Sequence, residues 1–183
     1  MSDDAPRYAD CPVIEIDVLI DAPPAAVWDL VSDIGLPARF GKEFQGARWA
    51  DDVTAPAPGC RFMGSNQHPA IGRWTTTCTL VEYEPERVFA YTVQDLDGIE
   101  PSSAWRYILT EEDGRTRLRQ WMRMGPGRSG LSFAIEAMPD KEPRIVAGRL
   151  RELRENMAAT LAGVKELAES GPPAQGRRGR GFS

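Results

Sequence analysis

The sequence is poor in the residues that most often carry chemistry. It contains one histidine, His68, and three cysteines, Cys11, Cys60 and Cys78, among 183 residues. No two cysteines form a CxxC pair, and their number is odd. We therefore predict reduced thiols that act as small apolar fillers, no zinc site and no cofactor.

Other absences narrow the function classes. The 22 Lys and Arg are outnumbered by 27 Asp and Glu, which gives a net charge of -5 and argues against a nucleic-acid binder. No apolar run approaches the ~18 residues of a membrane span. The acidic N-terminus has no signal-peptide core, so a cytoplasmic protein is expected. The sequence also has no GxSxG, no HExxH and no phosphate-binding glycine loop, so hydrolytic triads have no support.

What is present is a clear succession of periodic segments, with 42% hydrophobic residues available for a core. Alternating apolar residues predict strands, and apolar residues at steps of three and four predict helices. The strands are expected at 13–20, 47–51, 60–67, 74–84, 87–94, 104–110 and 116–125. Helices are expected at 24–34 and 131–138, a short helix followed by a turn at 36–45, and a long amphipathic helix at 144–169.

This order predicts one α+β domain at 13–169, in which hairpin-linked strands form an antiparallel sheet. Residues 1–12 are expected to be a flexible N-terminus. The Gly-, Pro- and Arg-rich residues 170–183 are predicted to be a disordered tail. A single helical stripe cannot fill the concave face of a wide curved sheet, so a gap between helix and sheet is expected.

Three segments carry a family likeness. VIEIDVLIDAPPAAVWDLVSDI, GRWTTTCTLVEYEPERVFAYTV and AGRLRELRENMAATLAGVKELAE resemble the first strand and helix, the long strand with its Pro turn, and the closing helix of the SRPBCC superfamily. This superfamily is related to START domains and to the birch-pollen allergen, and the bacterial polyketide cyclase/dehydrase branch is the most similar. The resemblance implies a helix-grip fold, a curved antiparallel sheet around a long C-terminal helix with a hydrophobic internal cavity.

A cavity would explain the small hydroxyls of Thr75, Thr76 and Thr77 within a strand. Ligand sites are mostly apolar with a few placed polar groups, and alternation puts suitable residues on common strand faces. The sequence does not decide which face of the strand at 74–84 lines the cavity. The predicted ligand-binding residues are Phe62, Asn66, Trp74, Thr76, Cys78, Trp105, Tyr107, Gln120, Met122 and Met124.

Several of these residues also have simpler interpretations. Asn66 could cap a turn, and Trp74 and Trp105 could be ordinary core residues. A buried amide at Gln120 needs a protein, ligand or water partner. His68 is the candidate catalytic base, although it precedes Pro69 in an expected loop and no Asp or Cys stands at a telling spacing.

The resemblance implies a protein that binds a hydrophobic, polycyclic, polyketide-like molecule, or a cyclase/dehydrase that folds and orients one in secondary metabolism. Two alternatives remain open. One is an enediyne resistance protein that binds the reactive product and is cleaved by it at a glycine, with Gly64, Gly72, Gly98 and Gly125 as candidates. The other is a co-chaperone-like module. Expected partners are one hydrophobic small molecule, no nucleic acid and no membrane; monomer and homodimer are not distinguished.

Overall fold

The computed structural model describes residues 6–50 and 52–171. After a 3-10 turn at Tyr8–Asp10, strand β1 (Val13–Ile20) leads into helix α1 (Pro24–Val31) and the 3-10 helix η2 (Leu36–Arg39). The remaining strands are β2 (Phe44–Trp49), β3 (Arg61–His68), β4 (Gly72–Glu84), β5 (Val88–Gln94), β6 (Pro101–Glu112) and β7 (Arg115–Met124). Helix α2 (Gly130–Ala137), a 3-10 turn at Pro139–Lys141 and helix α3 (Glu142–Ser170) complete the chain.

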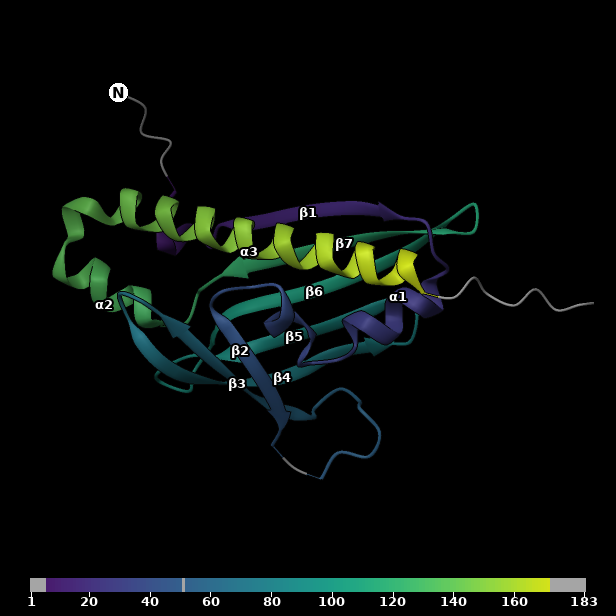
Figure 1. The fold of residues 1–183 in the computed structure, drawn as a ribbon. Coiled ribbons are helices and arrows are strands. Elements are labelled where there is room, and N and C mark those ends of the chain that lie inside the picture. Colours follow the sequence, from purple (N-terminus) through teal and green to yellow (C-terminus); the bar gives the residue numbers. More distant parts are fainter. Residues whose placement is uncertain (1–5, 51, 172–183) are drawn as a thin grey trace, which may run out of the picture.

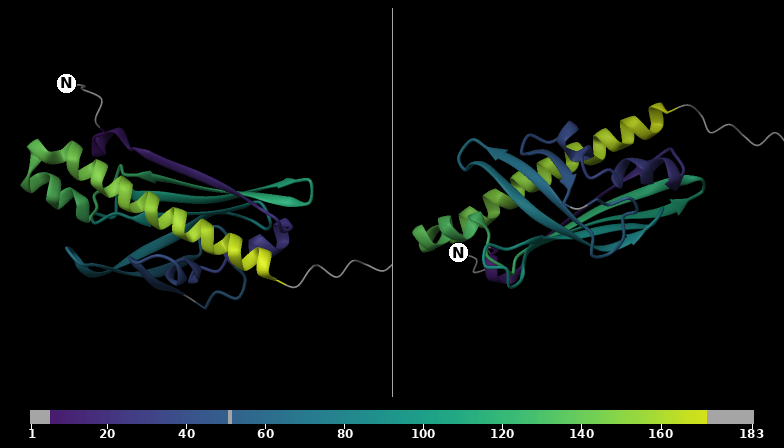
Figure 2. Two further views of the ribbon diagram at one scale, coloured as in Figure 1. Left: turned by 45° about the horizontal axis from the view of Figure 1, so that its top comes forward. Right: turned by 90° about the horizontal axis from the view of Figure 1, so that it is seen from below.

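The seven strands form one antiparallel sheet in the order β1-β7-β6-β5-β4-β3-β2. Among the described strands, β1 and β7 are the one neighbouring pair that is distant in sequence; every other pair is consecutive in the chain. Figures 1 and 2 show α3 running the length of the molecule across one face of the sheet, with β2 and β3 curling around it. The expected α+β architecture of a curved sheet around a long C-terminal helix is therefore confirmed.

One predicted strand boundary is wrong. The segment 36–45, expected to be a short helix and a turn, is helical at Leu36–Arg39, but β2 begins at Phe44, three residues before the strand expected at 47–51. Gly41 and Gly46 interrupt helical continuation, and the register of β2 with β3 shifts between Phe44 and Gly46. Gly46 has a φ of 143°, a conformation that favours glycine. Phe44 to Trp49 gain ladder hydrogen bonds with β3 that a helix at this place could not make.

Two apolar clusters hold α3 to the sheet at its two ends. Toward its C-terminus, Leu161 and Val164 pack with α1 and with Ile20 and Leu118. Nearer its N-terminus, Val146, Leu153 and Met157 pack with Ile14, Met122 and Met124. Gly163 allows a close approach of Phe40, because an added Cβ would lie 2.2 Å from the Phe40 ring.

The terminal segments are only partly described. Tyr8, within the segment predicted to be flexible, donates a hydrogen bond from its hydroxyl to the Gly127 carbonyl oxygen at 2.7 Å. Its backbone N–H donates to Glu142 at 3.0 Å. Residues 1–5 and 172–183 lie outside the described residues. The predicted tail at 170–183 therefore stays a prediction, except that Ser170 is the last residue of α3. Among the helices described, none is long and apolar enough to cross a membrane.

Candidate functional site

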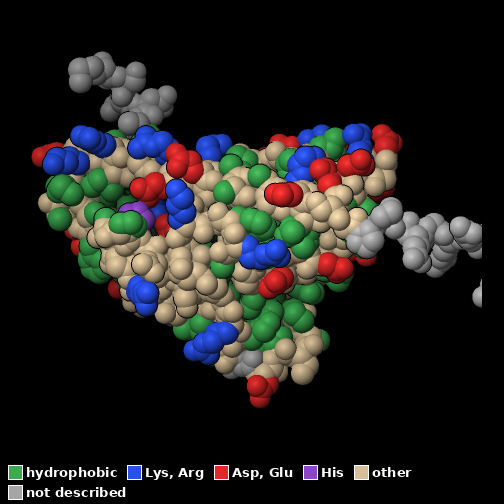
Figure 3. All heavy atoms as spheres, viewed as in Figure 1, with side chains coloured by type: hydrophobic (Ala, Val, Ile, Leu, Met, Phe, Trp, Pro, Cys, Tyr) green, Lys and Arg blue, Asp and Glu red, His purple; other side chains and the backbone are tan. Residues whose placement is uncertain are grey.

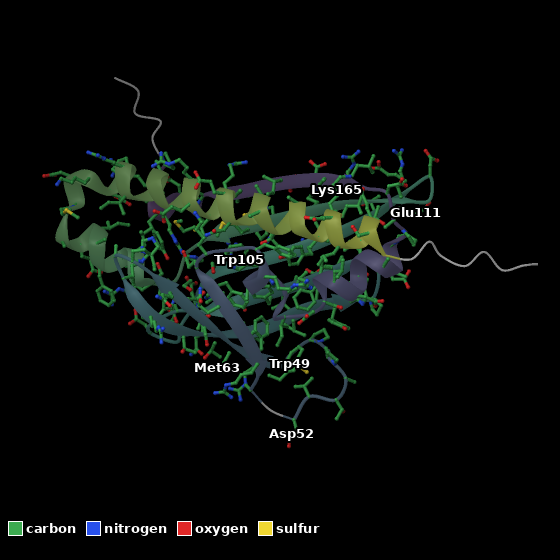
Figure 4. All side chains as sticks on the ribbon, in the orientation of Figure 1. Trp49, Asp52, Met63, Trp105, Glu111 and Lys165 are labelled. Carbon is green, nitrogen blue, oxygen red and sulfur yellow. The ribbon has the colours of Figure 1, made fainter. Side chains whose placement is uncertain are left out.

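A cavity of about 530 Å³ lies between α3 and the concave face of the sheet. Its walls come from β3 to β7, α3, α2 and the segment from α1 to β2. In Figure 4, Trp105, which lines the cavity, is labelled beneath the middle of α3, whereas Met63, which does not line it, lies lower, near β3. A volume of this size falls within the range of small-molecule sites, roughly 300–1,000 Å³.

The cavity brings together all ten residues predicted to bind a ligand. Strand alternation places them on the concave face, and the face of β4 that the sequence left open is the one with Trp74, Thr76 and Cys78. The ten lining residues are Phe62, Asn66, Trp74, Thr76, Cys78, Trp105, Tyr107, Gln120, Met122 and Met124. Their role in binding a ligand stays a prediction.

The small hydroxyls of β4 divide between the two faces of the strand. Thr76 lies beside the cavity, where its Oγ1 donates to the Gly64 carbonyl oxygen at 3.4 Å and accepts from Asn66 Nδ2 at 3.4 Å. Thr77 points the other way and donates to Met63 Sδ at 3.5 Å. Thr76 therefore leaves room where a larger side chain would fill the cavity. The Asn66 side chain donates a hydrogen bond to Thr76 on the neighbouring strand and also lines the cavity.

His68 is placed apart from the lining residues. It ends β3, and its Nδ1 accepts a hydrogen bond from the Ala70 backbone N–H at 3.2 Å. Its Nε2 lies 3.8 Å from a carboxylate oxygen of Glu152 on α3. In Figure 3 the purple histidine is visible at the surface among acidic and basic side chains. Its role as a base stays a prediction, and His68 is not among the residues that line the cavity.

An aromatic wall forms one side of the cavity. Tyr91 on β5 stacks on Trp105 of β6 with ring centroids 6.4 Å apart and planes 9° from parallel. Phe62 contacts Tyr91 edge to face at 5.2 Å, and Phe89 joins Tyr91 to Tyr107. Flat rings in this arrangement can contact the face of a planar ligand.

The sequence reasoning did not assign a site role to Tyr91, Glu43 or Arg149, all of which line the cavity. Tyr91 shares a strand face with Phe89 and Val93, a signal that alternation could have given. Arg149 falls between Val146 and Leu153 at steps of three and four, so a charge stands within the apolar stripe of α3. Glu43 carries no sequence signal, because its loop has no periodicity.

Glu43 and Arg149 form a bidentate ion pair at the cavity wall. Both Arg149 Nη atoms lie 2.6 Å from Glu43 carboxylate oxygens, and the side chains are only 18% and 14% exposed. Burial opposes the charge of Arg149, but the hydrogen bonds and charge of Glu43, aided by Glu152, outweigh burial and raise the pKa of the guanidinium. The pair joins the segment before β2 to α3.

Burial keeps the inner polar groups neutral. It raises the pKa of the Cys78 thiol from 9.0 to about 12, although a hydrogen bond with Thr76 acts in the opposite direction. It also raises the pKa of the Tyr107 phenol. The pKa of Tyr91 is raised by burial, with further contributions from Tyr107 and Cys78. None of these groups is an anionic nucleophile near neutral pH.

We predict that Cys78 resists alkylation. At pH 8 its thiolate fraction should be about a thousandfold below that of an ordinary thiol, because each pKa unit changes the fraction tenfold. Iodoacetamide should therefore modify Cys78 at least about a hundredfold more slowly in the native protein than in urea, as mass spectrometry of the peptides can measure. Cys11 and Cys60, both partly exposed, are internal comparisons.

The same shift has a consequence at high pH. The folded-state pKa of Cys78 lies above the unfolded value, so the unfolded chain ionises first. Stability from this group is complete below about pH 9 and declines as pH rises toward 12. In the iodoacetamide experiment, rapid modification of Cys78 in the native protein at pH 8 would show that its thiol is not buried as described.

Comparison with known proteins decides the family. A model of the family described as polyketide cyclase/dehydrase and lipid transport matches residues 12–168. The chain belongs to this family. No protein with a curated description matches the sequence.

Solved structures with the same fold accompany this match. The Polyketide_cyc-like protein Cgl2372 from Corynebacterium glutamicum is 25% identical with a TM-score of 0.61, covering 86% of this chain and 91% of its own. The Zhui aromatase/cyclase from Streptomyces sp. R1128 is 18% identical with a TM-score of 0.62, covering 86% and 93%. The di-domain aromatase/cyclase BexL, from the BE-7585A biosynthetic pathway, is 21% identical with a TM-score of 0.64, covering 88% of this chain and 51% of its own. The helix-grip fold predicted from the sequence is confirmed.

The four glycines of the resistance-protein alternative do not line the cavity within the described part of the chain. Gly72, Gly98 and Gly125 have positive φ angles. Gly64 lies in β3, where an added Cβ would lie 2.9 Å from Thr76 Oγ1 and 3.1 Å from the Phe44 ring. The geometry therefore accounts for these glycines by backbone conformation and close packing.

Proposed function

We propose that this protein binds an oxygenated, polycyclic, polyketide-like molecule in the cavity between α3 and the sheet. The observation that carries the proposal is the cavity itself, about 530 Å³ with an aromatic wall and a few neutral polar groups. Membership of the polyketide cyclase/dehydrase family and the aromatase/cyclase neighbours support the choice of ligand class. A neutral, largely apolar lining suits a planar ligand that carries a few oxygens.

As a cyclase, the protein would act by holding a poly-β-carbonyl chain in a folded shape. In an aldol condensation a methylene carbon loses a proton and bonds to a carbonyl carbon of the same chain. The carbonyl oxygen takes up that proton, and the resulting hydroxyl leaves as water with the second proton of the same methylene, which forms a carbon–carbon double bond. Proximity and exclusion of bulk water can accelerate such a step without a protein nucleophile. This mode agrees with the raised pKa of Cys78 and with the position of His68 outside the cavity lining.

The binding proposal is tested by titration with the apolar dye N-phenyl-1-naphthylamine and with an aromatic polyketide. Both should bind with micromolar Kd values, about -8 kcal/mol, and should quench tryptophan fluorescence. Trp105→Phe should remove much of the quenching, since Trp105 lines the cavity. Trp121→Phe is the matched control, because Trp121 lies on β7 outside the cavity lining.

Two results would contradict the proposal. One is the absence of any binding up to millimolar ligand. The other is quenching that depends on Trp121 and not on Trp105, which would place the ligand on the convex face. Turnover is tested separately, by comparing the product distribution of a poly-β-carbonyl substrate with and without the protein.

A further inference from the structure

Gln120 and Tyr107 form a buried pair on the wall of the cavity. They are directly opposite each other in the register of β7 and β6. Gln120 Nε2 donates a hydrogen bond to the Tyr107 hydroxyl oxygen at 3.1 Å. Each residue is 5% exposed, and both line the cavity.

This hydrogen bond leaves two polar functions without protein partners. Gln120 Oε1 is buried and has no hydrogen-bond partner among the described residues. The Tyr107 hydroxyl accepts from Gln120, and no described residue accepts its proton. The pair therefore offers one acceptor and one donor next to each other. Such groups discriminate strongly between ligands, because a ligand that leaves them unmatched incurs their desolvation.

The surroundings of the pair are neutral. Burial raises the pKa of Tyr107, and burial together with Tyr107 and Cys78 raises the pKa of Tyr91. The charged pair at the cavity wall, Glu43 with Arg149, is already matched internally. An ionised carboxylate or phosphate would gain no counter-charge beside Gln120, whereas a neutral group loses less hydration on entering.

We infer that the Gln120–Tyr107 pair recognises a neutral hydroxyl group, phenolic or enolic, on a flat ring system. The ligand O–H donates to Gln120 Oε1, and the ligand oxygen accepts from the Tyr107 hydroxyl. A ketone or an ether only accepts, so it satisfies Tyr107 and leaves Oε1 unmatched. The nearby Tyr91–Trp105 stack provides a flat surface for the ring.

This inference rests on the proposed function and narrows its ligand class. The Gln120–Tyr107 pair would favour molecules that carry an enol or phenol hydroxyl at the position it contacts over chains that carry only ketones there. The partner that a buried amide at Gln120 needs is Tyr107 for the amide N–H, and the atom left free is the acceptor Oε1.

The test uses 2-naphthol, 2-methoxynaphthalene and naphthalene as displacers of bound N-phenyl-1-naphthylamine. The measured quantity is the ratio of the Kd of the methyl ether to the Kd of the naphthol. Comparing this ratio between variants cancels the effect of the ligands' different water solubilities on their Kd values, because that effect is the same in every variant. We expect the ratio to fall about tenfold in Gln120→Leu, which corresponds to the loss of one hydrogen bond.

Tyr107→Phe removes only the hydroxyl, which donates to the naphthol and to the methyl ether alike. It should weaken both ligands by several fold relative to naphthalene and leave their ratio nearly unchanged. Leu118→Met is the matched control. Leu118 is buried on the same face of β7, two residues from Gln120, and is not a lining residue; its variant should keep the wild-type ratio. Naphthalene affinity should change little in Tyr107→Phe.

The outcomes separate the two proposals. If the dye does not bind, the proposed function fails. If the dye binds but the ratio is the same in wild type and Gln120→Leu, the hydroxyl inference is overturned and the binding function stands. A ratio that rises in Gln120→Leu also overturns it, because the amide then faces the ligand with its N–H. Should Gln120→Leu fail to fold, Gln120→Met, which also removes the acceptor oxygen, decides the question with the same ligands.

Discussion

Replacing Leu153 by tryptophan should abolish ligand binding and leave the fold intact. Leu153 lies on the inner face of α3, is 8% exposed and lines the cavity. An indole at this position extends into the space that the ligand would occupy. We expect Kd values for the dye and for an aromatic polyketide to rise at least about thirtyfold, or ~2 kcal/mol. Filling a cavity commonly stabilises a protein by ~0.5–2 kcal/mol, so the melting temperature should hold or rise.

The matched control is Arg154→Trp, which adds the same side chain to the exposed face of the same helix. Its dye affinity should equal that of the wild type, as fluorescence titration measures. Unchanged binding in Leu153→Trp, combined with a normal melting curve, would place the ligand somewhere other than the cavity. Equal losses in both variants would point to a general effect of a new tryptophan on α3.

Removing one partner of the Glu43–Arg149 pair should be among the most destabilising single changes outside the apolar core. Arg149→Met leaves the Glu43 carboxylate, 14% exposed, without its bidentate partner. Breaking a buried pair costs ~3–5 kcal/mol; the residual exposure of this pair lowers the expected loss to ~2–3 kcal/mol. Urea denaturation measures the free energy of unfolding directly.

A double variant isolates the cause. Glu43→Gln combined with Arg149→Met replaces both charges, so it should recover most of the stability lost in Arg149→Met alone. Arg87→Met is the surface control: Arg87 pairs with Glu84 at 3.1 Å, but the side chains are 75% and 53% exposed, and little change is expected. Equal losses in the single and double variants would show that the packing of the arginine stem matters, not the ion pair.

The sequence by itself determined most of the fold, because the periodic segments are long and consistent. Val13 to Ile20 alternates so regularly that the strand and its buried face follow directly. The stripe through Val146, Leu153 and Leu161 likewise gives α3 and its inner face. Where the pattern is weaker, the predicted strand at 47–51 begins three residues later than β2, which starts at Phe44, because pairing with β3 and not local preference decides that boundary.

Alternation also grouped the candidate site residues correctly on strand faces, since a two-residue period fixes which side chains share a side. Only the tertiary structure decided that the face of β4 with Thr76 is the cavity face. The curvature of the sheet and the path of α3 set that choice, and neither is a local property of the chain. Tertiary packing also brought Glu43 to Arg149, 106 residues apart in sequence. The register of β6 and β7 places Tyr107 opposite Gln120. The Gln120 amide N–H therefore donates to the Tyr107 hydroxyl, and Gln120 Oε1 is left free.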